Sequence, residues 1–243
     1  MTKRKRADLA LVERGLFESR ARAQAAIAAG LVTANGVAVH KASESIADGA
    51  DLRAAPAHPW VSRGGTKLAA ALDYFGFDPA GRACLDVGAS TGGFTEVLLA
   101  RGAARVYAVD VGRGQLHARL RDDARVISLE ATDIRALDPA ALAQRPDFAT
   151  IDVSFISLKL VLPSLDRLLR GPAHLVALIK PQFEAGRGHV KKGIVRDPAV
   201  HAAVCEEVAT FAAALGWRVA GVIPSPIEGG EGNREFLLGA RRD

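Results

Sequence analysis

The sequence lacks the features that mark a membrane or secreted protein. Its 243 residues contain no run of about 18 apolar side chains, so we expect no segment to span a membrane. The basic opening, MTKRKRADLALVERG, is interrupted by acids and an arginine before the core of a signal peptide could form. The two cysteines, Cys84 and Cys205, stand alone in apolar segments. We expect both to be reduced and buried, which suits the cytoplasm.

Patterns for metal binding and for repeats are also missing. The six histidines are scattered, and neither a CxxC pair nor a His/Cys ligand spacing occurs, so no metal is predicted. Nothing in the sequence implies a membrane or a stable protein partner. The hydrophobic share of 49% and charged share of 24% are typical of a globular protein with one large or two modest domains. The formal charge of +5 is compatible with a polyanionic partner.

The N-terminal end carries much of the positive charge. Residues 1–22 hold seven basic and three acidic side chains. Apolar residues and an N-cap at Ser19 predict two short helices, over about 6–14 and 19–29. The following GLVTANGVAV predicts a hairpin with an Asn-Gly turn.

Two interpretations of this basic segment stay open. One is a small domain with a solvated charged face. The other rests on the order of its parts, because residues 5–55 resemble the S4 RNA-binding domain. On that resemblance, domain boundaries of 1–57 for the RNA-binding domain, 58–65 for a linker and 66–243 for the remainder are expected. The resemblance also implies contacts with RNA phosphates from Lys3, Arg4, Arg6, Ser19 and Arg20.

Beyond the linker the chain alternates between strand and helix patterns. The strand candidates are RACLDVG, ARVYAVDV, RVISLEA, FATIDVSF, HLVALIKP, WRVAGVIP and REFLLGAR. Helical patterns between them include FTEVLLARGA, LVLPSLDRLLR and AVHAAVCEEVATFAAAL. This alternation predicts an α/β fold with a mostly parallel, doubly wound sheet. The connection between the last two strands is short, so one of them is expected to run antiparallel.

The first of these strands ends in LDVGASTGGF, a glycine loop before a helix. It departs from the G-x-G-x-x-G pattern of dinucleotide sites. An acidic residue before the glycines suits S-adenosylmethionine, whose amino group and sulfonium are cationic, and Asp86 is predicted to hold them. Asp110 and Asp133 end the next two strands and would bind the ribose hydroxyls and the adenine amino group. Each aspartate alone could equally be a helix cap or turn former.

Four further residues are expected to meet at the same edge of the sheet. Asp152 and Lys180 end the fourth and fifth strands, and ligands bind beyond the carboxyl ends of parallel strands. Glu235 precedes the last strand, whose start lies at that edge if it is antiparallel. Lys67 follows two glycines at the start of a helix, where acidic residues are favoured, so it needs a partner. Each of the four alone is more often a member of a surface ion pair.

Together these motifs resemble a known family. Residues 61–240 look like the FtsJ-type ribose 2′-O-methyltransferases, which use a Lys-Asp-Lys-Glu set, and WVSRGGTKL, DVSFISL, KPQFE and GNREFLL resemble the TlyA family in particular. That family comprises ribosomal RNA cytidine 2′-O-methyltransferases, historically labelled haemolysins. The resemblance implies a Rossmann-like class I methyltransferase with a seven-stranded sheet. It implies ribosomal RNA of the large subunit as the first substrate, with the small-subunit RNA modified by some members of the family. It further implies that S-adenosylmethionine contacts Gly88, Ala89, Ser90, Thr91, Gly92, Gly93, Phe94, Val111, Ile134 and Asp152.

The chemistry of a ribose hydroxyl suggests a role for each residue of this set. The hydroxyl must lose its proton as it attacks, and a lysine can take that proton only when burial or a second cation lowers its pKa. We expect Lys180 to deprotonate or orient the hydroxyl, Lys67 and Asp152 to tune and position it, and Glu235 to brace the set. A base-modifying enzyme would carry another loop where DVSF stands. A non-catalytic ribosome-binding factor and a membrane-lytic protein are the alternatives.

Overall fold

The structure is a computed structural model that describes residues 4–229 and 232–243. The chain divides into two compact units, Met1–Pro59 and Trp60–Asp243. The segment expected as a linker, 58–65, spans this division, and helix α3 (Gly64–Phe75) begins within it.

The first unit packs two helices against short strands. Helices α1 (Ala7–Glu13) and α2 (Arg20–Ala28) confirm the predicted pair, and the Oγ of Ser19 caps α2 by accepting the N–H of Arg22. The hairpin is confirmed too, since its Asn-Gly turn has two residues with positive φ. Buried apolar side chains of both helices and the strands form one core. The strands are β1 (Arg4–Arg6), β2 (Val32–Ala34), β3 (Val37–Ala38), β4 (Ser45–Ala47) and β5 (Leu52–Ala54).

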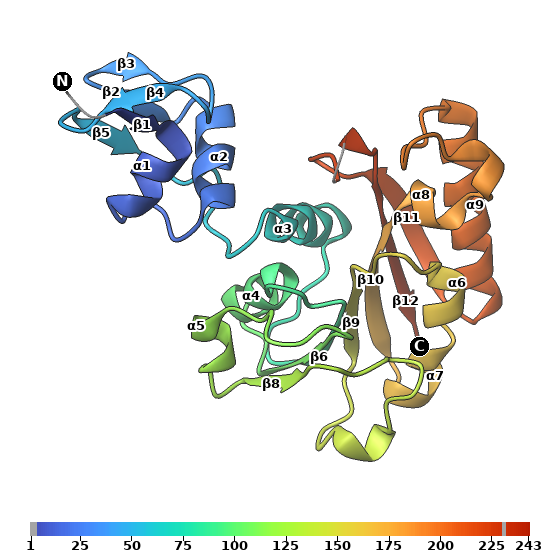
Figure 1. Cartoon of the computed structure of the whole chain (residues 1–243). Helices are drawn as coiled ribbons and strands as arrows, with labels where there is room; N and C mark the ends of the chain where they lie inside the picture. Colours follow the sequence, from blue (N-terminus) through green and yellow to red (C-terminus); the bar gives the residue numbers. More distant parts are fainter. Residues whose placement is uncertain (1–3, 230–231) are drawn as a thin grey trace. The chain divides into compact units, whose positions relative to one another are not determined.

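The second unit is built on a seven-stranded sheet in the order β11-β12-β10-β9-β6-β7-β8. All seven predicted strands are present. Figure 1 shows the sheet with helices α6 (Leu158–Val161) and α9 (Pro198–Ala214) beside it. Only β12 runs antiparallel to both of its neighbours, and the sequence prediction of a single antiparallel strand is confirmed. The strands are β6 (Ala83–Val87), β7 (Arg105–Val109), β8 (Val126–Leu129), β9 (Phe148–Ile151), β10 (Ala173–Ile179), β11 (Arg218–Pro224) and β12 (Phe236–Arg242).

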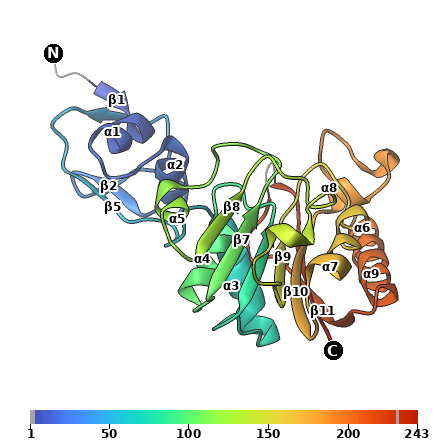
Figure 2. The ribbon, with the colours of Figure 1, turned by 90° about the horizontal axis from the view of Figure 1, so that it is seen from below.

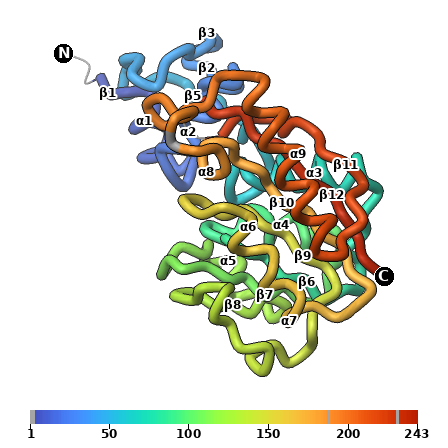
Figure 3. The backbone as a smooth tube through the Cα atoms, turned by 90° about the vertical axis from the view of Figure 1, so that its right-hand side faces the viewer, coloured from blue at the N-terminus to red at the C-terminus, as the bar shows by residue number. Residues whose placement is uncertain are grey.

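Helices cover both faces of this sheet, as a doubly wound fold requires (Figure 2). Apolar residues of α3 and α4 (Gly93–Ala100) form one core with the sheet, and α6, α7 (Ser164–Leu168) and α9 form the other. The α9 helix runs beside β11 (Figure 3). The short helices α5 (Ala118–Arg121) and α8 (Pro181–Glu184) lie in connections.

The structure differs from the sequence prediction in two details, one helix and one cysteine. The pattern LVLPSLDRLLR was expected as one helix but forms α6 and α7, because Pro163 has no N–H for a continuous helix. The cysteines are unpaired, with Cys84 buried in β6 and Cys205 partly exposed on α9.

The antiparallel pairing of β12 with β10 places Phe236 opposite Ile179. The start of β12 therefore lies at the edge where β10 and the other parallel strands end.

Candidate active site

The loop between β6 and α4 touches the end of β9. Gly88 follows β6 and has a φ of +82°, a conformation that favours glycine. A Cβ atom there would overlap the carbonyl oxygen of Asp152, and one at Gly93 would overlap the Oγ of Ser62. The glycines are needed because the main chain passes so close to its neighbours. Within this loop the backbone N–H groups of Gly88 and Ala89 donate to the carbonyl oxygen of Val109, and that of Gly92 donates to the carbonyl oxygen of Ala89.

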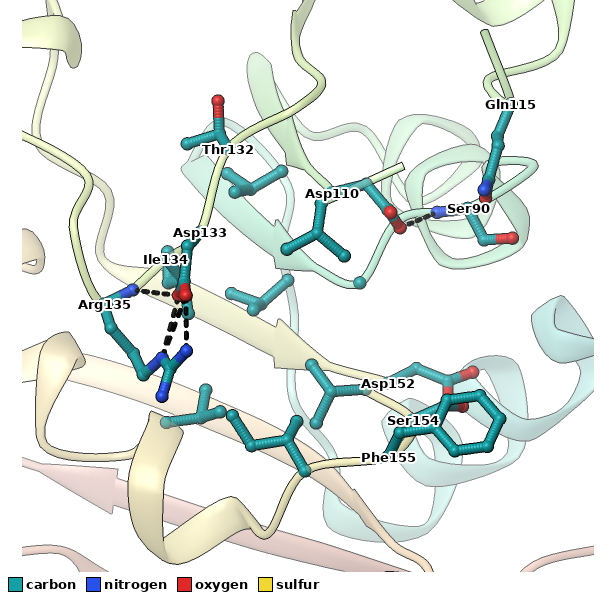
Figure 4. A pocket seen from close by; sticks show the side chains of 17 residues that line it. Ser90, Asp110, Gln115, Thr132, Asp133, Ile134, Arg135, Asp152, Ser154 and Phe155 are labelled. Atoms are coloured by element: carbon teal, nitrogen blue, oxygen red, sulfur yellow. Dashed lines mark hydrogen bonds and ion pairs between the residues drawn. The ribbon is translucent and has the colours of Figure 1, made fainter. Parts of the chain in front are cut away.

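A cavity of about 510 Å³ lies at the carboxyl ends of β6, β7 and β9 (Figure 4). Many of the residues predicted to contact the methyl donor line it: Gly88, Ser90, Asp110, Val111, Asp133, Ile134 and Asp152. The sequence analysis did not single out Gln115, Thr132 and Arg135, which also line this cavity. Nothing in their local sequence pattern distinguishes them from ordinary loop residues.

A second cavity, of about 290 Å³, is lined by Lys67, Lys180 and the far side of the glycine loop. Ala89, Thr91, Gly93 and Phe94 contribute to this second cavity. Gly92 lines neither cavity; it has a φ of +97°, and a Cβ atom there would overlap the side chain of Leu120. Its contact with the donor stays a prediction. Both cavities share Gly88, Ser90, Asp152 and Ser154.

Asp86 does not face either cavity, contrary to the sequence prediction. Its carboxyl group is fully buried and accepts hydrogen bonds from Thr95 Oγ1 at 2.6 Å and Thr150 Oγ1 at 3.0 Å. Burial raises the pKa of Asp86 to about 6. The carboxyl group thus links β6 to α4 and β9 beneath the glycine loop.

The other two strand-end aspartates do reach the larger cavity. Asp110 accepts the backbone N–H groups of Ser90 at 2.8 Å and Gly112 at 2.7 Å, which ties β7 to the glycine loop. Asp133 forms an ion pair with Arg135 at 2.6 Å, and this hydrogen-bonded guanidinium lowers the pKa of Asp133. Its carboxylate therefore has a protein partner that the sequence analysis did not anticipate.

Glu130 organises the loop that closes one side of the larger cavity. Its carboxylate accepts the backbone N–H groups of Gly114, Gln115 and Leu116 at 2.8–3.2 Å. These bonds lower the pKa of Glu130 and hold the side chain of Gln115 at the cavity wall. No motif in the sequence marks this role.

The four residues expected at the sheet edge form two ion pairs. The Nζ of Lys67 lies 2.5 Å from Oε2 of Glu235, with side chains only 7% and 3% exposed. The Nζ of Lys180 lies 2.6 Å from Oδ1 of Asp152. Lys67, Asp152 and Lys180 line the smaller cavity, and Glu235 is held beside it through Lys67. Opposite charges thus offset one another where burial makes isolated charges costly.

The partner of the lysine near the helix start is therefore Glu235. Lys67 lies on the first turn of α3, where the helix dipole disfavours a cation. Gly65 precedes it, and a Cβ atom at this glycine would overlap the ring of Trp60. The glycine is required because the tryptophan packs against this turn of α3.

Ser154 is a further residue of this site that the sequence analysis missed. Its Oγ accepts a hydrogen bond from Nζ of Lys180 at 2.9 Å. It follows β9 by three residues, and Phe155 after it has a positive φ of 65°. Only the DVSF motif, taken with the position of Lys180, could have suggested it.

Two arginines of the first unit share a buried acid. Arg6 and Arg20 both hydrogen bond to the carboxylate of Asp8, which also accepts from Gln24. The guanidinium of Arg6 is the main reason why the pKa of Asp8 lies well below its usual range. Both arginine side chains stay about half-exposed. Asp8 thus fixes two cations at the surface, a role that the sequence analysis missed.

The remaining residues predicted to contact RNA have different positions. Arg4 binds the side chain and carbonyl oxygen of Ser45. Ser19 serves as the N-cap of α2. Lys3 lies outside the described residues.

The described residues contain neither a metal-binding cluster nor a membrane-spanning helix. Within residues 4–229 and 232–243, no group of three or more His, Cys, Asp or Glu side chains could hold a metal ion. None of the helices in these ranges is long and apolar enough to cross a membrane.

Known proteins resemble this chain over nearly its whole length. The family model for FtsJ-like methyltransferases matches residues 60–242. The 16S/23S rRNA (cytidine-2′-O)-methyltransferase TlyA of Mycobacterium tuberculosis is 48% identical over 99% of the chain and 91% of its own length. YqxC of Bacillus subtilis is 49% identical over 98% and 85%. A solved structure from Streptococcus thermophilus, labelled as a hemolysin, has a TM-score of 0.79 with 45% identity, covering 100% of this chain and 90% of that one.

Proposed function

Because the chain belongs to the TlyA family of FtsJ-like methyltransferases, we propose that it methylates the 2′-hydroxyl of a cytidine in ribosomal RNA, with S-adenosylmethionine as methyl donor. One observation carries the proposal: two ion pairs join Lys67, Asp152, Lys180 and Glu235 beside the cavity proposed for the donor. The relatives named for this activity favour a cytidine of the large-subunit RNA, with the small subunit as a second target.

The larger cavity suits S-adenosylmethionine in size and chemistry. Its volume lies in the range of small-molecule sites, and its walls combine carboxylates with apolar side chains. Asp110 would accept the ribose hydroxyls, and Asp133 would accept the adenine amino group if it turned from Arg135. Val111 and Ile134 would flank the adenine ring. When bound, the donor supplies a methyl carbon attached to a positively charged sulfur.

The smaller cavity would receive the ribose. The step requires Lys180 as a neutral amine, whose lone pair would take the proton of the acceptor hydroxyl while the hydroxyl oxygen bonds to the methyl carbon. The donor would leave as a neutral thioether that keeps the electron pair of its carbon–sulfur bond. Lys180 then releases the proton to water. Asp152 holds the Lys180 head group by charge, and the Lys67–Glu235 pair forms the opposite wall.

We also propose that residues 1–57 form an S4-like RNA-binding domain, joined through 58–65 to the methyltransferase domain. Support comes from the two helices, the hairpin and the half-exposed guanidinium groups fixed by Asp8. Arg4, Arg6, Ser19 and Arg20 would contact phosphates, which position an RNA without reading its sequence. Lys3 would contribute a further positive charge. A ribosomal substrate would place the protein in the cytoplasm.

The test is methyl transfer from labelled S-adenosylmethionine to ribosomal RNA and to assembled subunits. Wild type is compared with Lys180→Ala and with the control Lys159→Ala, whose lysine forms a surface pair with Glu207. We expect label on a ribose, lost only in Lys180→Ala. Label on a base would refute the proposed chemistry. If the protein binds ribosomal RNA but transfers no methyl group to it, the non-catalytic alternative would be favoured.

A further inference from the structure

The head group of Lys180 has two contacts of different kinds. Its distance to Oδ1 of Asp152 is 2.6 Å, yet that oxygen has no hydrogen-bond partner among the described residues. The contact is therefore an ion pair without hydrogen-bond alignment. The contact with Oγ of Ser154, at 2.9 Å, does have hydrogen-bond geometry. Asp152 therefore holds the Lys180 head group by charge, while the hydrogen bond to Ser154 sets its orientation.

Ser154 also lies where the two cavities meet. It lines both, together with Asp152, and Figure 4 shows these two side chains next to each other at the rim of the larger cavity. A methyl group that moves from one cavity to the other must pass this junction. The hydroxyl of Ser154 is therefore close to the line of transfer, beside the lysine proposed to act on the acceptor.

We propose that Ser154 is a positioning residue that aims Nζ of Lys180 at the acceptor hydroxyl, an inference that rests on the proposed function. A lysine nitrogen has four tetrahedral directions, one of which leads to its own carbon chain. A hydrogen bond to Ser154 fixes a second direction, and the charge of Asp152 holds the group in place. The remaining directions then point to the smaller cavity, where the ribose would lie.

A hydroxyl suits this task better than a second carboxylate would. It accepts one hydrogen bond and adds no negative charge. In the structure two acids pair with two lysines, so the charges balance before substrate binds. Serine fixes the lysine geometrically and leaves this balance unchanged.

The kinetic test compares Ser154→Ala, Ser154→Thr and the control Ser157→Ala. The Ser157 hydroxyl bonds to Glu184 and lines neither cavity. We expect Ser154→Ala to lower kcat about 10- to 100-fold, as for a lost hydrogen bond to a charged group, with KM for RNA and Kd for S-adenosylmethionine within about twofold of wild type. Threonine keeps the hydroxyl and should restore most of the rate. Ser157→Ala should leave kcat within about twofold.

A second measurement does not depend on catalysis. Nuclear magnetic resonance relaxation of the ¹⁵N-labelled Lys180 side chain, assigned by loss of its signal in Lys180→Arg, reports how well its head group is ordered. We expect an ordered group in wild type and Ser154→Thr, and a more mobile one in Ser154→Ala.

The outcomes separate this inference from the proposed function. If wild type transfers no methyl group to ribose, the proposed function fails, and the relaxation data still decide whether Ser154 orders Lys180. The inference is overturned if Ser154→Ala leaves the lysine equally ordered. An unchanged kcat, or a loss confined to KM or donor affinity, overturns it as well, because Ser154 would then be a structural or ligand-binding residue.

Discussion

Replacing Asp86 by asparagine should stabilise the protein at neutral pH, although Asp86 is buried and fully hydrogen-bonded. Burial raises the pKa of its carboxyl group from the ordinary 3.8 to about 6 in the folded state. Between these values the folded protein binds a proton that the unfolded chain has released. The free energy of unfolding therefore falls as pH rises through this window. This loss of stability, the deficit caused by ionising Asp86, is complete above about pH 6.

The size of the effect follows from the same two values. An interval from pH 3.8 to about 6, at about 1.4 kcal/mol per pH unit, amounts to about 3 kcal/mol. About 2 kcal/mol of this deficit develops between pH 4.5 and pH 8, since part of it is already present at the lower pH. Asparagine cannot ionise, and Thr95 and Thr150 can rotate their hydroxyl groups to suit it. Asp86→Asn should thus gain about 2 kcal/mol relative to wild type over this pH range.

Urea unfolding of both proteins at several pH values measures this difference. The control is Asp166→Asn, whose side chain is 86% exposed and pairs with Arg242 at the surface. It should show no comparable pH-dependent gain. Parallel stability curves for Asp86→Asn and wild type between pH 4.5 and 8 would refute the reasoning.

The same variant tests whether Asp86 contacts the methyl donor. Since the carboxyl group faces neither cavity, we expect Kd for S-adenosylmethionine to change by less than about tenfold. Loss of a direct partner for a buried cation would cost about 3–5 kcal/mol, or more than about 100-fold in affinity. A loss of that size would restore the role that the sequence first suggested.

Three further predictions concern other parts of the chain. Lys67→Met leaves the buried carboxylate of Glu235 unpaired, so it should cost about 3–5 kcal/mol in urea unfolding, and adding Glu235→Gln should recover part of that loss. Gly88→Ala should abolish binding of S-adenosylmethionine in calorimetry, because the added Cβ would overlap the carbonyl oxygen of Asp152. The control is Gly216→Ala. Gly216 also has a positive φ but lies in open space, so alanine there should cost only about 1–2 kcal/mol of stability. Arg20→Ala should weaken binding to ribosomal RNA and reduce the slope of log K against log salt by about 0.7–0.9, and an unchanged slope would show that this arginine contacts no phosphate.

The strand and helix order could be predicted because each element carries its own local signal. Apolar strands alternate with amphipathic helices, Ser19 is an N-cap, and the Asn-Gly pair sets a hairpin turn. Family membership was also accessible, since its motifs are contiguous in sequence, and the comparisons confirm it. The break between α6 and α7 also has a local signal, because Pro163 cannot donate a backbone N–H.

The direction of the Asp86 side chain could not be predicted from the local sequence. The residues Leu85 and Val87 pack into one core of the sheet, so the intervening Asp86 points to the other face, toward α4. A strand buried on both faces is apolar throughout, and its sequence does not show which way one aspartate points. The sequence could not show, for this reason, that Asp86 lines neither cavity.

The sequence by itself determined the order of elements, the family and the residue types available at the sheet edge. Only the tertiary structure decided which of them meet. Lys67 and Glu235 are 168 residues apart, and they pair because β12 enters antiparallel at the carboxyl end of β10. Ser154 binds Lys180 because adjacent parallel strands end side by side. Such contacts depend on strand pairing between distant segments, which no local pattern of residues encodes.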